Sequence, residues 1–277
     1  MTSINTNINA LRASNALSRN GSAQQQTMEQ LSTGKRINRA SDDAAGLAIR
    51  ETMTAQITGL NAAIKNANDG ISLLQTADGA LSETSSLLQR MRELAVLSVN
   101  DTYSSAQKTA MSTEYVALAS QIDQIAANTQ FNGIKVLNGD GGLTGTTSQY
   151  TFQVGANTAQ TMSVYIAPQS LSTYVLSGTT IDTAANATTQ IGLIDTALTT
   201  LNTQRSTIGA AVNRLSHALD NLSNVAANTT DSRSKIEDTD YATATSDLAR
   251  QQIIAQAATA ILAQANQQPQ YVLSLLK

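Results

Sequence analysis

The sequence has no cysteine and no tryptophan, and only 3% of its 277 residues are aromatic. Without cysteine the chain can form no disulfide, no thiolate metal site and no cysteine nucleophile. Because compact cores usually depend on large aromatic side chains, their scarcity argues against an ordinary globular core. Alanine, leucine, isoleucine and small polar residues dominate instead, which favours long helices packed at close distance.

Charge is also sparse, since 17 basic and 20 acidic residues leave a net charge of −3. No basic patch stands out, so nucleic-acid binding is not expected. No stretch of 18 apolar residues occurs, which argues against membrane insertion. The first residues also lack the basic and apolar regions of a secretory signal peptide, so we expect export without a cleaved signal peptide.

Residues that could carry catalysis or hold a cofactor are missing as well. The one histidine, His217, lies between Leu215 and Leu219 on a predicted helix, and a lone histidine makes a poor metal site. The glycine cluster at 139–142 is not followed by the Lys-Ser/Thr pair of a phosphate-binding loop. The acidic pairs have no second cluster to support acid–base chemistry. We therefore expect no enzyme activity, no cofactor and no metal.

Both ends of the chain have the pattern of amphipathic helices. Residues 1–34 contain only three charged groups, Arg12, Arg19 and Glu29, and residues 251–276 contain none. Because isolated helices are marginal in water, and nothing else in the chain can cover both, we expect these arms to pack against other copies of the same chain. The predicted subunit-packing positions are Ile4, Ile8, Leu11, Leu248, Ile254, Leu262, Leu273 and Leu276.

The regions between the arms alternate between helical and turn-rich patterns. Apolar residues repeat at three- and four-residue spacing from an expected N-cap at Ser41 to about residue 98, with a break at Asp78. The pattern returns near residues 111 and 188, and Arg205 interrupts it once. Between these helices, Asn132-Gly133 predicts a tight turn, and alternating apolar residues around 155–157 predict a β-hairpin.

The predicted fold is mainly α: a long antiparallel helical bundle or coiled-coil rod with a small β-hairpin region in the middle of the chain. Residues 1–40 and 237–277 would form terminal coiled-coil arms, residues 41–137 and 188–236 a helical bundle, and residues 138–187 a short hairpin segment rich in Gly, Thr and Ser. Between the first arm and the bundle we expect a non-helical or loosely helical connector, with its charges paired within or between subunits; the basic residues face two aspartates and could form salt bridges with them. The connector charges are Lys35, Arg36, Arg39, Asp42 and Asp43.

Several blocks of the sequence resemble bacterial flagellins, in the order and spacing of that family. The blocks are residues 31–38, 42–49, 66–72, 89–96, 129–133, 236–241, 262–267 and 272–276. The resemblance covers about residues 1–137 and 190–277, and departs from the family in details such as Gln268 and Tyr271 on either side of Pro269. It implies a structural subunit that polymerises into the helical flagellar filament for motility. The alternative is the hook–filament junction protein of the flagellum, which has similar helical ends.

The resemblance also implies a location and a set of partners. Members of the family leave the cell unfolded through the flagellar type III export apparatus and assemble outside it, with the arms in the inner filament core and the bundle in the outer core. Besides other copies of the chain, the implied partners are the flagellar cap, the hook–filament junction and export chaperone proteins. Family members that activate Toll-like receptor 5 use outer-bundle residues whose counterparts here are Gln89, Arg90, Leu94 and Glu114.

Overall fold

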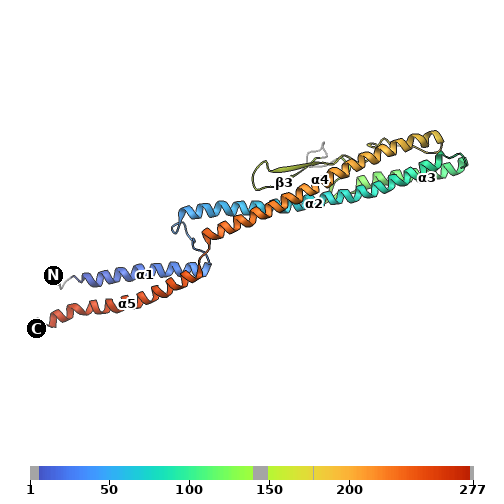
Figure 1. The fold of residues 1–277 in the computed structure, drawn as a ribbon. Coiled ribbons are helices and arrows are strands. Elements are labelled where there is room, and N and C mark those ends of the chain that lie inside the picture. The colour runs from blue at the N-terminus through green and yellow to red at the C-terminus, as the bar shows by residue number, and fades with distance from the viewer. Residues whose placement is uncertain (1–5, 140–148, 177, 275–277) are drawn as a thin grey trace. The chain divides into compact units, whose positions relative to one another are not determined.

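The computed structural model describes residues 6–139, 149–176 and 178–274, with side-chain surroundings up to residue 267. In chain order it has the elements α1 (Ile8–Thr33), α2 (Ala44–Val99), α3 (Ser105–Asn128), β1 (Gln130–Phe131), β2 (Ile134–Lys135), β3 (Gln149–Gln153), β4 (Thr161–Tyr165), α4 (Ala184–Glu237) and α5 (Tyr241–Ser274) (Figure 1). The prediction of a mainly α fold with a small β-hairpin region in mid-chain is confirmed. Among the described residues, no helix is long and apolar enough to cross a membrane.

The chain divides into two compact units. One comprises residues 1–55 and 228–277, and the other comprises residues 56–227. The divisions fall inside α2 and α4, so the connector and the first turns of α2 belong with the arms. The sequence patterns placed these boundaries near residues 40 and 237 instead, where the helical periodicity breaks.

In the first unit, α1 and α5 lie side by side and antiparallel (Figure 1). Asn7 is the N-cap of α1: its side chain accepts a hydrogen bond from the N–H of Ala10 at 3.0 Å and donates one to the carbonyl of Ala265 on α5 at 2.7 Å. Further along, the Asn20 amide donates to the carbonyl of Gln251 at 2.8 Å. These bonds from side-chain amides to the backbone of the other helix hold the two helices together.

In the second unit, α2 and α4 pack antiparallel, and α3 lies beside them (Figure 1). A cluster of buried side chains joins the three helices and includes Met91, Tyr115 and Ile194. The two charged residues that interrupt the apolar repeats, Asp78 and Arg205, pair with each other at 2.8 Å. The interruptions in the two helices are therefore matched across the helix–helix contact.

The hairpin predicted around residues 155–157 forms, and the tight turn predicted at Asn132-Gly133 joins a second, short hairpin. β1 pairs with β2 around Asn132 and Gly133, whose φ angles of 51° and 80° match the positive values that a type I′ turn requires. β3 pairs with β4 in antiparallel register, with Tyr150 opposite Val164. Both of these side chains are buried in a cluster with α2 and α4, so one face of the hairpin covers the helices.

Two glycines in α2 allow the second hairpin to approach closely. A Cβ atom at Gly59 would lie 2.9 Å from the Cβ of Ala156, and one at Gly70 would lie 3.0 Å from the ring of Phe152. Glycine in a helix interior costs about 0.5–1 kcal/mol relative to alanine. At these two positions the cost is offset by contact between the helix and the hairpin.

The expected N-cap at Ser41 is wrong, because α2 begins at Ala44 and is capped by Asp43. The Asp43 side chain accepts a hydrogen bond from the N–H of Gly46 at 2.8 Å, and its carbonyl accepts one from the N–H of Leu47 at 3.0 Å. A Cβ at Gly46 would lie 2.7 Å from Ile37. The chain before the helix therefore packs on its first turn, and this contact moves the start of the helix past Ser41.

Candidate functional site

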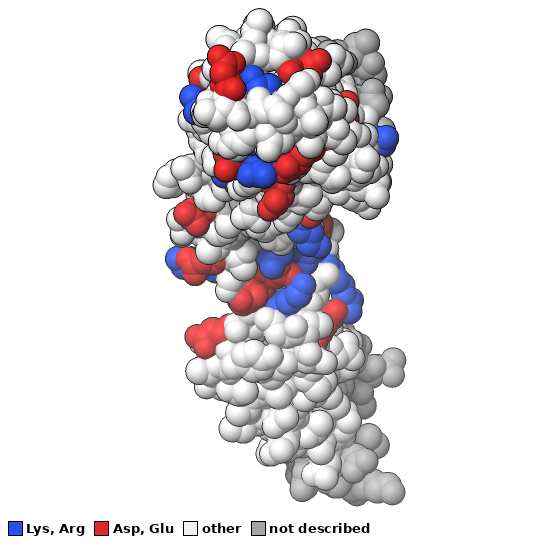
Figure 2. Space-filling model, turned by 90° about the vertical axis from the view of Figure 1, so that its right-hand side faces the viewer, with Lys and Arg blue, Asp and Glu red and all other residues white. Residues whose placement is uncertain are grey.

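The surface of α1 and α5 exposes large apolar side chains and very little charge. Ile8, Leu11, Ile253 and Ile261 are 54%, 60%, 67% and 58% exposed. On the face that Figure 2 shows, the described residues of these helices, in the lower part of the view, present few charged side chains. Apolar area left in water forgoes roughly 25 cal/mol per Å² that burial would contribute, so this surface is suited to a partner.

The eight packing positions predicted from the sequence fall into three groups. Ile8, Leu11 and Ile254 are exposed, Leu248 and Leu262 are half-buried, and Ile4, Leu273 and Leu276 lie outside the residues whose side chains are described. The helical spacing missed Ile253 and Ile261, which lie off the predicted stripe. How far each apolar side chain of α5 is exposed depends on how α5 is rotated against α1, and spacing alone does not determine this rotation.

A shallow groove of about 620 Å³ runs between the two helices. Its lining includes Ala13 and Ala16 from α1 and Ala258 and Ile261 from α5, with Arg12 at its side. Small side chains on both walls let another backbone come close. The exposed apolar surface and the groove together form the candidate site, which we call the arm surface.

The connector between α1 and α2 is non-helical and held by backbone contacts. Gly34 ends α1 with a φ angle of 71°, and its N–H donates to the carbonyl of Gln30 at 2.9 Å. Ile37 is 1% exposed. The Asp42 carboxylate accepts hydrogen bonds from the N–H groups of Asn38 at 3.1 Å and Arg39 at 2.9 Å. The buried side chain of Ile37 and the hydrogen bonds to the Asp42 carboxylate therefore give the connector a defined conformation.

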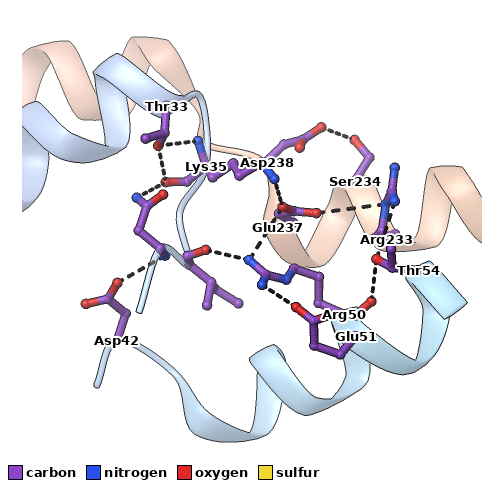
Figure 3. Close-up of polar contacts among 12 residues, drawn as sticks. Thr33, Lys35, Asp42, Arg50, Glu51, Thr54, Arg233, Ser234, Glu237 and Asp238 are labelled. Atoms are coloured by element: carbon purple, nitrogen blue, oxygen red, sulfur yellow. Dashed lines mark hydrogen bonds and ion pairs between the residues drawn. The ribbon is translucent and has the colours of Figure 1, made fainter. Parts of the chain in front are cut away.

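Glu237, the last residue of α4, lies among basic side chains from the connector, α2 and α4 (Figure 3). Its side chain is only 7% exposed. Its Oε1 atom pairs with the ammonium group of Lys35 and lies 3.6 Å from Nη1 of Arg50, and its Oε2 atom lies 3.8 Å from Nε of Arg233. The backbone of Glu237 is also bonded to the connector, because its carbonyl accepts a hydrogen bond from the N–H of Arg36 at 2.6 Å. One buried carboxylate thus holds cations from three segments of the chain.

Lys35 and Arg39 form ion pairs within the subunit, but their partners are not Asp42 and Asp43. The sequence placed the basic residues against Asp42 and Asp43, but both aspartates accept hydrogen bonds from backbone N–H groups instead. The basic residues find other partners: Lys35 pairs with Glu237, Arg39 pairs with Glu29 at 2.7 Å, and Arg36 donates to the carbonyl of Ile236 at 2.8 Å. The N–H groups of a turn and of a first helical turn lack partners along the chain, so a nearby carboxylate satisfies them first.

Three of the four residues named for the immune receptor, Gln89, Arg90 and Glu114, are exposed on α2 and α3. Arg90 pairs with Glu114 at 2.9 Å and with Glu93 at 2.6 Å. The hydrogen bond to Glu93, and to a smaller extent the one to Glu114, raises the pKa of the Arg90 guanidinium. Leu94 differs: it is 2% exposed and packs in the cluster shared by the three helices. Its side chain belongs to the core and is not exposed with the other three.

Comparison with known families decides what the chain is. The N-terminal helical region of bacterial flagellin matches residues 4–141, and the C-terminal helical region of bacterial flagellin matches residues 191–276. The chain belongs to the bacterial flagellin family. It is 43% identical to a flagellin of Bacillus subtilis (strain 168) and 44% identical to a flagellin of Halalkalibacterium halodurans, each comparison covering 99% of both chains. Flagellin FlaB2 of Treponema pallidum is 39% identical over the same shares.

Two solved structures of flagellar proteins are also similar to this chain. The crystal structure of Bacillus cereus flagellin is similar to this flagellin with a TM-score of 0.52 and 34% identity, covering 57% of this chain and 88% of that one. A putative flagellar hook-associated protein from Vibrio parahaemolyticus has a TM-score of 0.61 over 71% of this chain and 100% of its own. Its identity is only 13%, so that likeness shows a shared fold and does not favour the junction-protein alternative.

This flagellin is a structural subunit of the bacterial flagellar filament, which serves motility. It polymerises with other copies of itself, outside the cell. Its length suits a short form without a large outer domain, because relatives of similar length match it end to end. The residues between the two matched regions hold β3 and β4.

Sequence reasoning missed the residues that hold the connector. Glu237 belongs to an acidic group for which the sequence predicts no chemistry, and Arg50 and Arg233 fall in no predicted site. Glu237 is about two hundred positions along the chain from Lys35 and Arg50, so no local spacing brings these groups together. The one available signal is an acidic residue at the C-terminal end of a helix, where the helix dipole disfavours it.

Proposed function

We propose that the arm surface is the main contact between copies of this flagellin in the filament, with α1 and α5 in the inner core and the helices of the second unit in the outer core. The observation that carries this proposal is the exposure of Ile8, Leu11, Ile253 and Ile261 on two helices that are otherwise almost uncharged. A subunit with such a surface gains free energy by covering it. Contacts that do not close into a ring extend into a helical filament.

The free energies involved require a contact surface that extends along both α1 and α5. Fully burying one Leu or Ile side chain contributes about 1.5–3 kcal/mol. Association costs roughly 4–15 kcal/mol in lost freedom of motion. One or two side chains are therefore insufficient, and the exposed positions from Ile8 to Ile261 have to act together. Removing a few of them would weaken assembly without abolishing the fold of the second unit.

Deletion and point variants test this proposal. Deleting residues 242–277 should leave a soluble, partly helical monomer that does not polymerise, and proteolysis of the intact monomer should leave a core near residues 40–235. Ile253→Gln together with Ile261→Gln should raise the critical concentration for assembly about tenfold or more, the effect of ~1.4 kcal/mol. The matched control is Gln252→Ala with Gln256→Ala, which removes exposed amides from the same helix. Normal filaments from the deleted chain would overturn the proposal.

We further propose that this flagellin leaves the cell unfolded through the flagellar type III apparatus, without a cleaved signal peptide, and meets an export chaperone, the flagellar cap and the hook–filament junction proteins on its way. The support is membership of the family and an arm surface that needs covering before assembly. Pull-down of each partner by wild type, but not by the chain lacking residues 242–277, would support a role of α5 in these encounters. Equal capture of both chains would exclude it.

A receptor contact is proposed for the second unit. The support is that Gln89, Arg90 and Glu114 are exposed and that Arg90 and Glu114 pair with each other, so these polar side chains are open to contact by Toll-like receptor 5. Arg90→Ala should lower signalling by monomer about thirtyfold, since truncating an interface arginine anchor typically costs 2 kcal/mol or more, while the melting temperature stays unchanged. Leu94→Ala should instead lower the melting temperature of the monomer, because it removes a buried side chain from the core. A receptor reporter assay in which wild-type monomer is inert, or Arg90→Ala is fully active, would refute the contact.

A further inference from the structure

We propose that Glu237 is a positioning residue for assembly: its buried carboxylate holds α1 and α5 in one register by joining the connector that follows α1 to the end of α4 that precedes α5. The inference rests on the proposed function of the arm surface, and adds the group that sets its geometry. A filament contact needs the exposed side chains of α1 and α5 at fixed offsets. A contact within each subunit therefore has to fix the position of α5 along α1.

The contacts around Glu237 join segments on both sides of the arms. Lys35 lies in the connector just after α1, Arg50 lies in the first turns of α2, and Arg233 lies one turn before Glu237 in α4. The three cations all lie beside the same carboxylate, Lys35 and Arg50 at its Oε1 atom and Arg233 at its Oε2 atom. Figure 3 shows their side chains converging on it from these separate segments.

The backbone at the same place forms a short antiparallel pairing. Besides the bond from Arg36 to the Glu237 carbonyl, the N–H of Thr239 donates to the carbonyl of Gly34 at 3.0 Å. This pairing joins the residue that ends α1 to the residues just before α5. A shift of α5 by one turn against α1 would break both bonds, so the pairing and the helix register are linked.

Charge makes this register the favoured one. Without Glu237, three cations would be left close together, with Glu51 and Asp238 as the acids beside them, and Asp238 already bonds to Ser234. The side chains of Lys35, Arg50 and Arg233 are 49%, 18% and 30% exposed, so water would screen part of their repulsion, but the attraction that draws the three segments together would be lost. The backbone bonds alone would then have to hold the connector against repulsion between the cations.

The test uses the absence of cysteine in this flagellin. Thr27 and Gln251 bond across α1 and α5 at 3.1 Å, so Thr27→Cys with Gln251→Cys reports the native register through a short bis-maleimide cross-linker. Thr27→Cys with Leu248→Cys reports a register shifted by about one turn. Both pairs are measured in monomer and in filaments, first in the otherwise unchanged chain and then together with Glu237→Gln or Glu237→Asp. Glu51→Gln, at an exposed acid beside Arg50, is the matched control.

Glu237→Gln should lower the cross-linking rate of the native pair about tenfold relative to the shifted pair, the effect of ~1.4 kcal/mol. Glu237→Asp should recover part of that rate, and Glu51→Gln should change it little. Lys35→Gln, which removes one cation, should give a smaller loss. If Glu237→Gln and Glu51→Gln have equal effects, or the wild type cross-links both pairs equally, the inference is wrong. The proposed function fails by a different readout, the normal polymerisation of the Ile253→Gln and Ile261→Gln variant.

Discussion

At the scale of single residues, the connector shows how much depends on groups far apart in the chain. Gly34, Ile37 and Gly46 shape its backbone, and Glu237 supplies its central charge. A glycine after a helix is a recognisable stop signal. The burial of Ile37 and the pairing of Glu237 are not recognisable from the sequence, because both depend on segments that meet only after folding.

Val175 has an unusual backbone for its residue type. Its φ angle is 58° and its side chain is 66% exposed, between the buried side chains of Tyr174 and Leu176. A β-branched residue in the left-handed region is strained, typically by about 1–2 kcal/mol. Val175→Asn should therefore raise the free energy of unfolding of the monomer by about 1 kcal/mol, since asparagine visits this region more readily.

Urea denaturation of the monomer measures this change. Val116→Asn is the matched control, because Val116 is an exposed valine in the regular backbone of α3, where the substitution relieves no strain. A stability gain that is the same at both positions would show that exposure of the valine, and not its backbone angle, is responsible.

At the scale of elements, helix and hairpin formation is the part that sequence predicts best. Apolar repeats placed the helices, and Asn132-Gly133 placed the first turn, since both signals act over a few neighbouring residues. The start of α2 was misplaced because Ser41, Asp42 and Asp43 are all good cap residues in a row. Only the packing of Ile37 against Gly46 decides among them.

The docking of the second hairpin on α2 can be tested with glycine substitutions. A Cβ atom at Gly79 would have nothing within 4 Å, whereas one at Gly59 would meet Ala156 at 2.9 Å. Gly79→Ala should stabilise the monomer by up to about 1 kcal/mol through helix propensity. Gly59→Ala should lose that gain or destabilise, because the hairpin has to move. Equal stabilisation by both substitutions in thermal unfolding would show that the hairpin does not rest on the helix.

The start of α5 should be sensitive to acid. Asp240 caps this helix, and hydrogen bonds from the Thr243 hydroxyl and from the backbone N–H groups of Ala242 and Thr243 lower its pKa from 3.8. A lowered pKa contributes stability that is present above the unfolded-state value and is lost as the pH falls through the folded-state value.

Filaments should therefore melt at lower temperature as the pH falls below about 4. Asp240→Asn keeps a capping side chain but cannot titrate, so its melting temperature should change less over this range. Melting curves recorded at a series of pH values provide the measurement. If the two filaments lose stability in parallel, the Asp240 cap is not what titrates.

At the scale of the whole molecule, the second unit contains the buried core, and the first unit carries the surface proposed for assembly. The second unit has buried clusters that join α2, α3, α4 and the hairpins, and it needs no partner to cover them. The first unit holds α1 against α5 by amide-to-backbone bonds and leaves large apolar side chains in water. We therefore expect the second unit to fold in the monomer and the arms to gain most of their stability in the filament.

The most direct test of the arm surface is cysteine labelling before and after assembly, which the cysteine-free chain allows without background. Ile253→Cys should react rapidly with a maleimide in the monomer and at least about tenfold more slowly in the filament, because neighbouring copies cover it. Tyr165→Cys, on the exposed face of β4, is the matched control and should react alike in both. Equal labelling of Ile253→Cys in monomer and filament would contradict the burial of the arm surface between subunits.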